Sequence, residues 1–182
     1  MATTKTGKVI LTGVKPLLFD RYMGSNDAKP EPIEKVYWTQ DGEACLPTLN
    51  LYSSLTAENT KSVAKMFYGR NAKKVGMAVN SFLYIPETEL TLNREGKPFH
   101  IDNFDKQFEV VEHVARLDKG IPNPKVRPML RAPWTTEFSF EFTSSPDCSW
   151  EVMVKMFQQA GIIGLGTYRP IFGTYHVQVV ES

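Results

Sequence analysis

The sequence lacks the features that define several classes of protein. Two cysteines among 182 residues, Cys45 and Cys148, are too few for a disulfide framework or a four-ligand zinc site, although a single bridge stays open. No apolar run approaches the ~20 residues of a membrane-spanning helix. The polar residues 1–8 lack the apolar core of a secretory signal. A reduced, cytoplasmic protein without a membrane partner is expected.

Motifs of the common enzyme classes are also missing. The chain contains no GxSxG, no HExxH, no CxxC and no His/Asp cluster with metal-ligand spacing. Cys45 is expected to be a buried free cysteine rather than a thiol nucleophile. The sequence therefore predicts no metal and no cofactor.

Net charge is close to zero, because 21 Lys and Arg balance 20 Asp and Glu. Strongly basic nucleic-acid-binding domains have a pI above ~9, whereas this chain has a pI near 7.7. The charges are nevertheless segregated along the chain. Residues 61–74 and 116–131 are basic, and residues 102–112 and 137–151 are acidic. The pattern indicates basic and acidic faces on one body, with ordinary solvated faces as the alternative.

Hydrophobic periodicity predicts a mixed fold. Strands are expected at 8–13, 77–85, 108–117, 135–142 and 175–180, and hairpins at 35–46 and 89–101. For 108–117 a helix is the alternative, and strand is favoured. One helix or two short ones are expected within 48–68, and a clear helix at 149–160 is ended by Gly161. Residues 24–34 are predicted to form a Pro-rich surface loop, and residues 119–131 an exposed, extended, basic Pro-rich loop. This order predicts a single α+β domain over 1–182, with a mainly antiparallel sheet and helices on one face.

Residues 161–176, GIIGLGTYRPIFGTYH, are rich in glycine. A dinucleotide fingerprint follows a strand and opens a helix, whereas this segment follows a helix and leads into a strand, and no Walker Gly-Lys-Ser/Thr is present. The segment resembles the C-terminal glycine-rich loop of the RAMP superfamily, the RRM-like proteins of CRISPR effector complexes. Gly164, Leu165 and Gly166, then Arg169 and Gly173, fill the family pattern, although its second glycine pair is reduced to Gly173.

The resemblance implies a ferredoxin-like/RRM-like antiparallel sheet with inserted hairpin and loop excursions. It further implies binding of single-stranded nucleic acid, with RNA favoured and ssDNA as the alternative, and copies that assemble head to tail along the strand or join a ribonucleoprotein complex. The chain looks like a small single-domain member of the kind found in bacteriophages, which would place it in the cytoplasm of a bacterial host.

The predicted nucleic-acid-binding residues are basic, aromatic or glycine, as grooves for single strands require. For Trp134 and Phe172 the alternative is a place in the core. The full set is Lys61, Lys65, Arg70, Lys73, Lys74, Lys125, Arg127, Arg131, Trp134, Gly164, Gly166, Tyr168, Arg169, Phe172 and Gly173.

Some members of the superfamily cleave RNA with a histidine, usually early in the chain near the first helix. This chain has only His100, His113 and His176, none of them there. A non-catalytic protein is therefore expected. Two alternatives stay open: a metal-independent endoribonuclease that uses a histidine, and a phage interaction or structural component that binds no nucleic acid.

Overall fold

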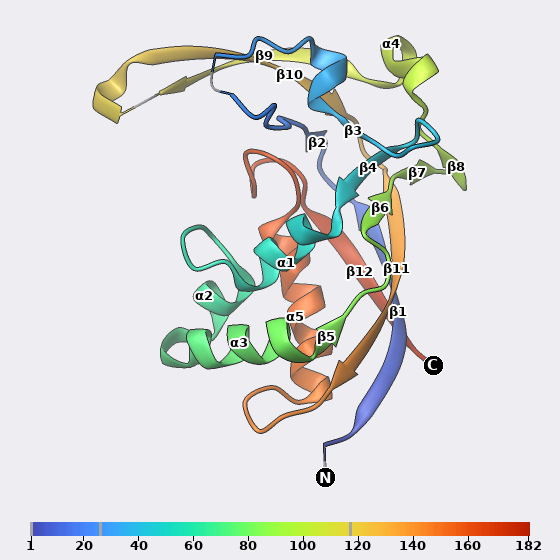
Figure 1. The fold of residues 1–182 in the computed structure, drawn as a ribbon, viewed down its shortest axis with the longest axis vertical. Coiled ribbons are helices and arrows are strands. Elements are labelled where there is room, and N and C mark those ends of the chain that lie inside the picture. Colours follow the sequence, from blue (N-terminus) through green and yellow to red (C-terminus); the bar gives the residue numbers. More distant parts are fainter. Residues whose placement is uncertain (1, 26, 117) are drawn as a thin grey trace.

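The computed structural model describes residues 2–25, 27–116 and 118–182 (Figure 1). Its main sheet is built on three long antiparallel strands, β1 (Thr4–Gly13), β11 (Thr135–Thr143) and β12 (Tyr175–Glu181). The strand order is β12-β1-β11-β7-β8, with β7 at Asn93–Arg94 and β8 at Lys97–Pro98, and β5 (Leu83–Tyr84) also pairs with β11. In the centre, Val9 is opposite Phe138 on one side and Val179 on the other. The alternation of Phe138, Phe140 and Phe142 with polar residues turns the phenylalanines to one face.

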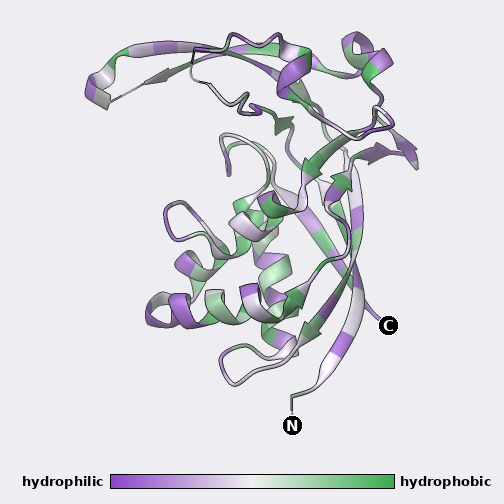
Figure 2. Cartoon of the chain, in the orientation of Figure 1, coloured by the Kyte–Doolittle hydropathy of each residue, from purple (hydrophilic) through white to green (hydrophobic). Residues whose placement is uncertain are grey.

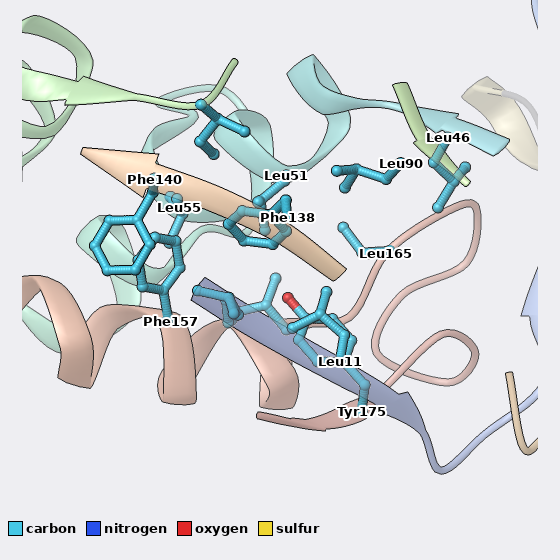
Figure 3. Packing of buried hydrophobic residues seen from close by; sticks show 14 of the residues in the cluster. Leu11, Leu46, Leu51, Leu55, Leu90, Phe138, Phe140, Phe157, Leu165 and Tyr175 are labelled. Atoms are coloured by element: carbon cyan, nitrogen blue, oxygen red, sulfur yellow. The ribbon is translucent and has the colours of Figure 1, made fainter. Parts of the chain in front are cut away.

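Four helices cover that face: α1 (Thr48–Thr56), α2 (Val63–Phe67), α3 (Ala72–Phe82) and α5 (Trp150–Ile163). The order β1, helices, β5, β11, α5, β12 is the βαββαβ order of a ferredoxin-like fold, so the predicted fold class is confirmed. Figure 3 shows the core, in which Phe157 of α5 contacts Phe138 and Phe140, with ring centroids 5.7 and 5.0 Å away. Two helices, α1 and α2, fill the predicted helical stretch 48–68.

The predicted helix at 149–160 is α5, and its N-terminus is capped as expected. The Ser149 hydroxyl accepts from the backbone N–H of Val152 at 3.2 Å. Gly161 does not end the helix; instead it lies against the carbonyl of Tyr175, where a Cβ would overlap the oxygen. The helix ends at Gly164, with φ +85°.

Shorter elements form a second layer beside the end of the main sheet. A small sheet has the order β3-β4-β6, with β3 (Tyr37–Trp38), β4 (Ala44–Pro47) and β6 (Glu89–Thr91). The predicted second hairpin is β7 (Asn93–Arg94) and β8 (Lys97–Pro98), closed by Glu95 and Gly96 at positive φ. Here α4 (Phe104–Gln107) leads to Phe108, whose ring contacts Phe19, Trp38, Phe99 and Phe104.

A long two-stranded hairpin projects from this second layer (Figure 1). It consists of β9 (Glu109–Arg116) and β10 (Pro122–Leu130), and we call it the arm. At its base, β10 also pairs with β2 (Leu17–Leu18). The predicted strand at 108–117 is confirmed over Glu109–Arg116, and residue 117 lies outside the described residues. The predicted exposed loop at 119–131 is wrong, because most of it is β10.

The prolines of β10 explain how a Pro-rich segment forms a strand. Pro122, Pro124 and Pro128 have the same orientation in β10, because alternate residues of a strand direct their N–H and C=O to the same side. The carbonyls of Val126 and Pro128 accept from Lys35 and from the Phe19 N–H, away from β9. The missing proline N–H groups would therefore point away from β9, and no β9–β10 hydrogen bond is lost.

The predicted buried strand at 77–85 is also wrong, because residues 72–82 form α3. Val75, Ala78 and Val79 lie on the buried side of this helix, with Met77 and Phe82 exposed, which is a helical rather than an alternating pattern. Only Leu83 and Tyr84 continue as the short strand β5.

Candidate nucleic-acid interface

The glycine-rich segment forms a loop, residues 164–174, that lies beneath the arm (Figure 1). Gly164, Gly166 and Gly173 all have positive φ. The Leu165 N–H donates to the Gly173 carbonyl at 3.0 Å, and the Gly173 N–H donates to the Pro16 carbonyl at 2.8 Å. A Cβ on Gly173 would overlap the carbonyl of Leu165. The glycines therefore let the loop pack against itself and against the segment that leads into β2.

Tyr168 is the aromatic residue that this loop presents. It is 37% exposed and has φ +58°, an unusual value for a residue with a side chain. The guanidinium carbon of Arg127, on β10, lies 5.0 Å from the centre of its ring. His113, on β9, has its ring centroid 5.9 Å from that of Tyr168 and 5.6 Å from that of Phe172. The loop and the inner face of the arm thus meet through aromatic rings and one guanidinium.

Arg127 is buried, with 6% of its surface exposed, and it is paired inside the protein. Its Nη2 and Nε lie 2.8 and 2.9 Å from Oδ2 of Asp20, and the Lys35 amine lies 3.7 Å from Oδ1 of the same carboxylate. A guanidinium held in this way anchors the arm. This corrects the prediction that Arg127 contacts phosphate directly.

The polar groups of two further predicted binding residues, Trp134 and Arg131, also have partners within the protein. Trp134 is fully buried and its indole N–H donates to the Lys15 carbonyl at 3.0 Å, so the alternative of a place in the core is confirmed and a stacking role is excluded. Arg131 is exposed but forms a two-pronged ion pair with Glu109 at the base of the arm.

Arg169 connects the loop to the helical layer. One nitrogen of its guanidinium lies 3.4 Å from the Ser53 hydroxyl and 3.4 Å from the Lys61 carbonyl. The side chain is half-buried, and this burial lowers the pKa of Arg169. Lys61, Arg169, Tyr168 and the arm therefore form a continuous series of contacts on one side of the molecule.

The first basic cluster continues this side of the molecule over α2 and α3. Lys61, Lys65, Arg70, Lys73 and Lys74 are all exposed, and none of them forms an ion pair with any residue that the structure describes. Figure 2 shows hydrophilic residues gathered at the N-terminal end of α3. A hollow of about 600 Å³ lies beside it, lined by Lys73, Lys74, Met77, Phe82 and Asp147 among others. Lys125 lies on the arm, opposite His113, and is half-buried.

The uncovered face of the main sheet differs from this side. Lys8, Ile10 and Thr12 of β1 and Glu137, Ser139 and Glu141 of β11 alternate with the buried positions. These central positions hold no aromatic ring on which a base could stack. Exposed rings on this face lie only at its margins among the described residues: His176 is opposite Thr12, and Tyr84 is opposite Glu141.

The titratable groups are scattered. His100 lies beside Asp102 and the Asp41 carbonyl, His176 lies exposed on β12, and only His113 contacts the loop.

Across residues 2–25, 27–116 and 118–182 no group of three or more His, Cys, Asp or Glu could hold a metal ion. Cys45 and Cys148 are both free and buried. None of the helices in the described part of the chain is long and apolar enough to cross a membrane.

Asp20 and Lys35 are functional neighbours that sequence reasoning missed. Asp20 is 107 positions from Arg127, and Lys35 lies at the end of the Pro-rich loop. No local pattern marks either residue, because each is defined by a partner on β10.

Comparison with solved structures shows a likeness of fold. No protein-family model and no curated protein matches the chain. Among solved structures, a chain in the cryo-EM structure of the type III-B Cmr-β complex bound to cognate target RNA matches with a TM-score of 0.57 and 12% identity. The match covers 98% of this chain and 61% of the other, so this chain spans about three fifths of that neighbour. At this identity the likeness concerns the fold.

Proposed function

We propose that this protein is a non-catalytic, single-domain, RAMP-like protein that binds single-stranded nucleic acid, with RNA favoured over ssDNA. The observation that carries the proposal is the series of contacts from Lys61 through Arg169 and Tyr168 to the arm. It brings the exposed Lys61 and the half-buried Arg169 close to the exposed ring of Tyr168, and a cationic groove with an aromatic ring is the combination that holds single strands. The fold likeness to a chain in an RNA-bound complex supports the choice of RNA.

The first experiment measures binding of labelled single-stranded RNA and DNA of one sequence at ~50 mM salt, where phosphate contacts are strongest. Tyr168→Ala should weaken binding by about 5- to 100-fold, because stacking contributes ~1–3 kcal/mol per base. Tyr168→Phe keeps the ring and should bind like the parent. Tyr22→Ala removes a more exposed tyrosine from the segment before the Pro-rich loop and serves as the matched control. Absence of binding to either nucleic acid refutes the proposal and favours an interaction or structural component.

Head-to-tail assembly along the strand is part of this proposal. The outer face of the arm exposes Val110, Val114 and Val126, and the hollow beside α3 is flanked by the exposed Met77 and Phe82. These apolar surfaces lie at opposite ends of the molecule, so they meet only between neighbouring copies (Figure 1). The number of copies bound should rise in proportion to RNA length in light scattering. Val114→Asp should abolish that rise and leave the binding of one copy to a short RNA intact.

A histidine-dependent endoribonuclease is the second candidate, and one contact favours it. His113 is the histidine that lies within the candidate interface, against Tyr168 and Phe172. Cleavage of RNA in EDTA that disappears in His113→Ala and persists in His176→Ala would establish this activity and refute the non-catalytic assignment. Intact RNA after prolonged incubation with the parent supports a binding protein.

We further propose that the chain is a subunit of a ribonucleoprotein assembly of the bacteriophage-encoded kind, in the host cytoplasm. The fold likeness to a chain of an RNA-bound structure supports the part of this proposal that concerns an assembly with RNA. Purified protein should then carry host RNA, seen as a raised absorbance at 260 nm that nuclease treatment removes.

A further inference from the structure

The two ends of the main sheet differ in how they are protected. One end is β8, which is two residues long and consists of Lys97 and Pro98. Short edge strands, lysine and proline are common devices that prevent an edge from pairing with another chain. The other end is β12, which is seven residues long, YHVQVVE, and has none of them. Within the described residues, β12 pairs with β1 and with no other strand.

Hydrogen-bond geometry shows which groups of β12 are free. The Gly13 N–H donates to Trp134 on the β11 side, so the neighbouring Thr12 points to β12. Thr12 is opposite His176, and His176, Gln178 and Val180 therefore point back to β1. The Ser182 N–H, which donates to Thr6, follows the same alternation. Val177, Val179 and Glu181 consequently direct their N–H and C=O groups away from the sheet.

The side chains of this edge are apolar and only partly covered. Val177 and Val179 face the helical layer and are half-buried, packed against the core at its margin. Tyr175 is covered at the start of the strand, where its carbonyl lies against Gly161. From Val177 onward the outward N–H and C=O groups of β12 have no partner strand among the described residues. The apolar side chains of Val177 and Val179 beside them are only half-buried.

We propose that the outer edge of β12 pairs antiparallel with β12 of a second copy, about a two-fold axis at Gln178. In this register Val177 and Val179 exchange backbone hydrogen bonds with Val179 and Val177 of the second copy. The valines meet on the helical side and His176 faces Val180, and the pairing ends before Tyr175, whose carbonyl is covered by Gly161. No like charges are opposed, and the two sheets become one.

The contact closes after two copies and leaves the arm, the glycine-rich loop and α3 free. It is independent of the proposed function, because it requires no nucleic acid. A register shifted by one residue would bring inward-directed groups to the interface, so the free groups exclude the one-residue shifts.

The experiment measures the mass of nuclease-treated protein by light scattering between ~1 and 100 μM. A mass of twice 20.6 kDa is expected at the upper concentrations. Val179→Pro removes an outward N–H without removing a β1–β12 hydrogen bond, so it should give monomers that remain folded. Val179→Thr keeps the N–H and the β-branched shape and should remain a dimer. A parent that is monomeric throughout, or a dimeric Val179→Pro, overturns the proposal.

Hydrogen exchange on the parent protein gives a second test that needs no variant. The amides of Gln178 and Val180 are protected by β1 at every concentration. The amides of Val177 and Val179 should be protected at 100 μM and exchange at least tenfold faster at 1 μM. Equal, rapid exchange of both at all concentrations refutes the pairing, whatever the behaviour of Val179→Pro.

Discussion

The guanidinium of Arg127 lies over the ring of Tyr168, with 5.0 Å between the guanidinium carbon and the ring centre, while two of its nitrogens donate to Asp20. One side chain thus joins the arm, the segment after β2 and the glycine-rich loop. A guanidinium on an aromatic face contributes about 0.5–2 kcal/mol, more when water is excluded. The contact with Arg127 therefore holds the ring of Tyr168 in position, and the partly exposed ring needs no ligand to fix its orientation.

Asp20→Asn should destabilise the protein by about 3 kcal/mol, because it leaves two cations, Arg127 and Lys35, beside a neutral amide. The measurement is the midpoint of urea unfolding. Glu137→Gln breaks the exposed pair with Lys8 and should leave the midpoint almost unchanged, since exposed pairs contribute little. Equal effects of the two substitutions would contradict the anchoring role of Asp20.

Lys65 and Lys73 should determine part of the salt dependence of binding. Replacement of both by Gln should weaken binding of every RNA sequence alike and reduce the slope of log affinity against log salt by about 1.4, or ~0.7 per phosphate contact. Lys5 and Lys8 lie on β1 and pair with Glu181 and Glu137. Their replacement by Gln is the control and should leave the slope unchanged.

Gly173→Ala and Gly96→Ala separate backbone conformation from steric overlap. Both glycines have φ near +75°, but Gly96 has open space around its Cα, whereas a Cβ on Gly173 meets the Leu165 carbonyl. Gly96→Ala should cost about 1 kcal/mol, the price of a left-handed conformation. Gly173→Ala should cost several times more in the free energy of unfolding and displace Tyr168. Similar losses in the two variants would show that the loop can relax.

Both cysteines should be unreactive in the native protein. Burial raises the pKa of Cys45 to about 12 and that of Cys148 to about 11, so almost no thiolate exists at pH 8. Alkylation by iodoacetamide should be negligible before unfolding and complete in urea. Rapid alkylation of native protein at pH 8 would contradict this burial.

The same pKa values predict that the free energy of unfolding falls at high pH. The folded state keeps two thiol protons that the unfolded chain releases above pH ~8.5. The stabilisation is complete below that pH, and it falls as the pH rises toward 11 and 12. Urea unfolding between pH 8 and 10.5 should show this decline, and the Cys45→Ala, Cys148→Ala double variant should show less of it.

Elements with a strong local signal were predictable from the sequence. The alternating phenylalanines of β11 and the Ser149 cap of α5 are determined by neighbouring residues, and both are present. The glycine-rich loop, whose bends require positive φ, was also found by its composition. Local chemistry therefore determined β11, the start of α5 and the position of the glycine-rich loop.

Features that depend on distant partners were not predictable. Three prolines indicate a loop, yet β10 is a strand because β9 supplies its hydrogen bonds on the side that prolines leave intact. Trp134 and Arg127 have the composition of a binding site, but Lys15 and Asp20 occupy their polar groups. The sequence shows that a residue is charged or aromatic. It does not show whether a distant residue of the fold already binds that side chain.

The prolines of β10 make one edge of the arm, the side of β10 that faces away from β9, rich in hydrogen-bond acceptors and poor in donors. From Pro122 to Pro128 that edge presents the carbonyls of alternate residues, and Val126 supplies its N–H. Lys35 and Phe19 donate to this row near the base, and the carbonyls of Pro122 and Pro124 continue it toward the tip. Such a row of acceptors attracts hydroxyl and amino hydrogens and repels phosphate oxygens. A nucleic acid that approached this edge would have to turn its sugars or bases, and not its backbone phosphates, toward the arm.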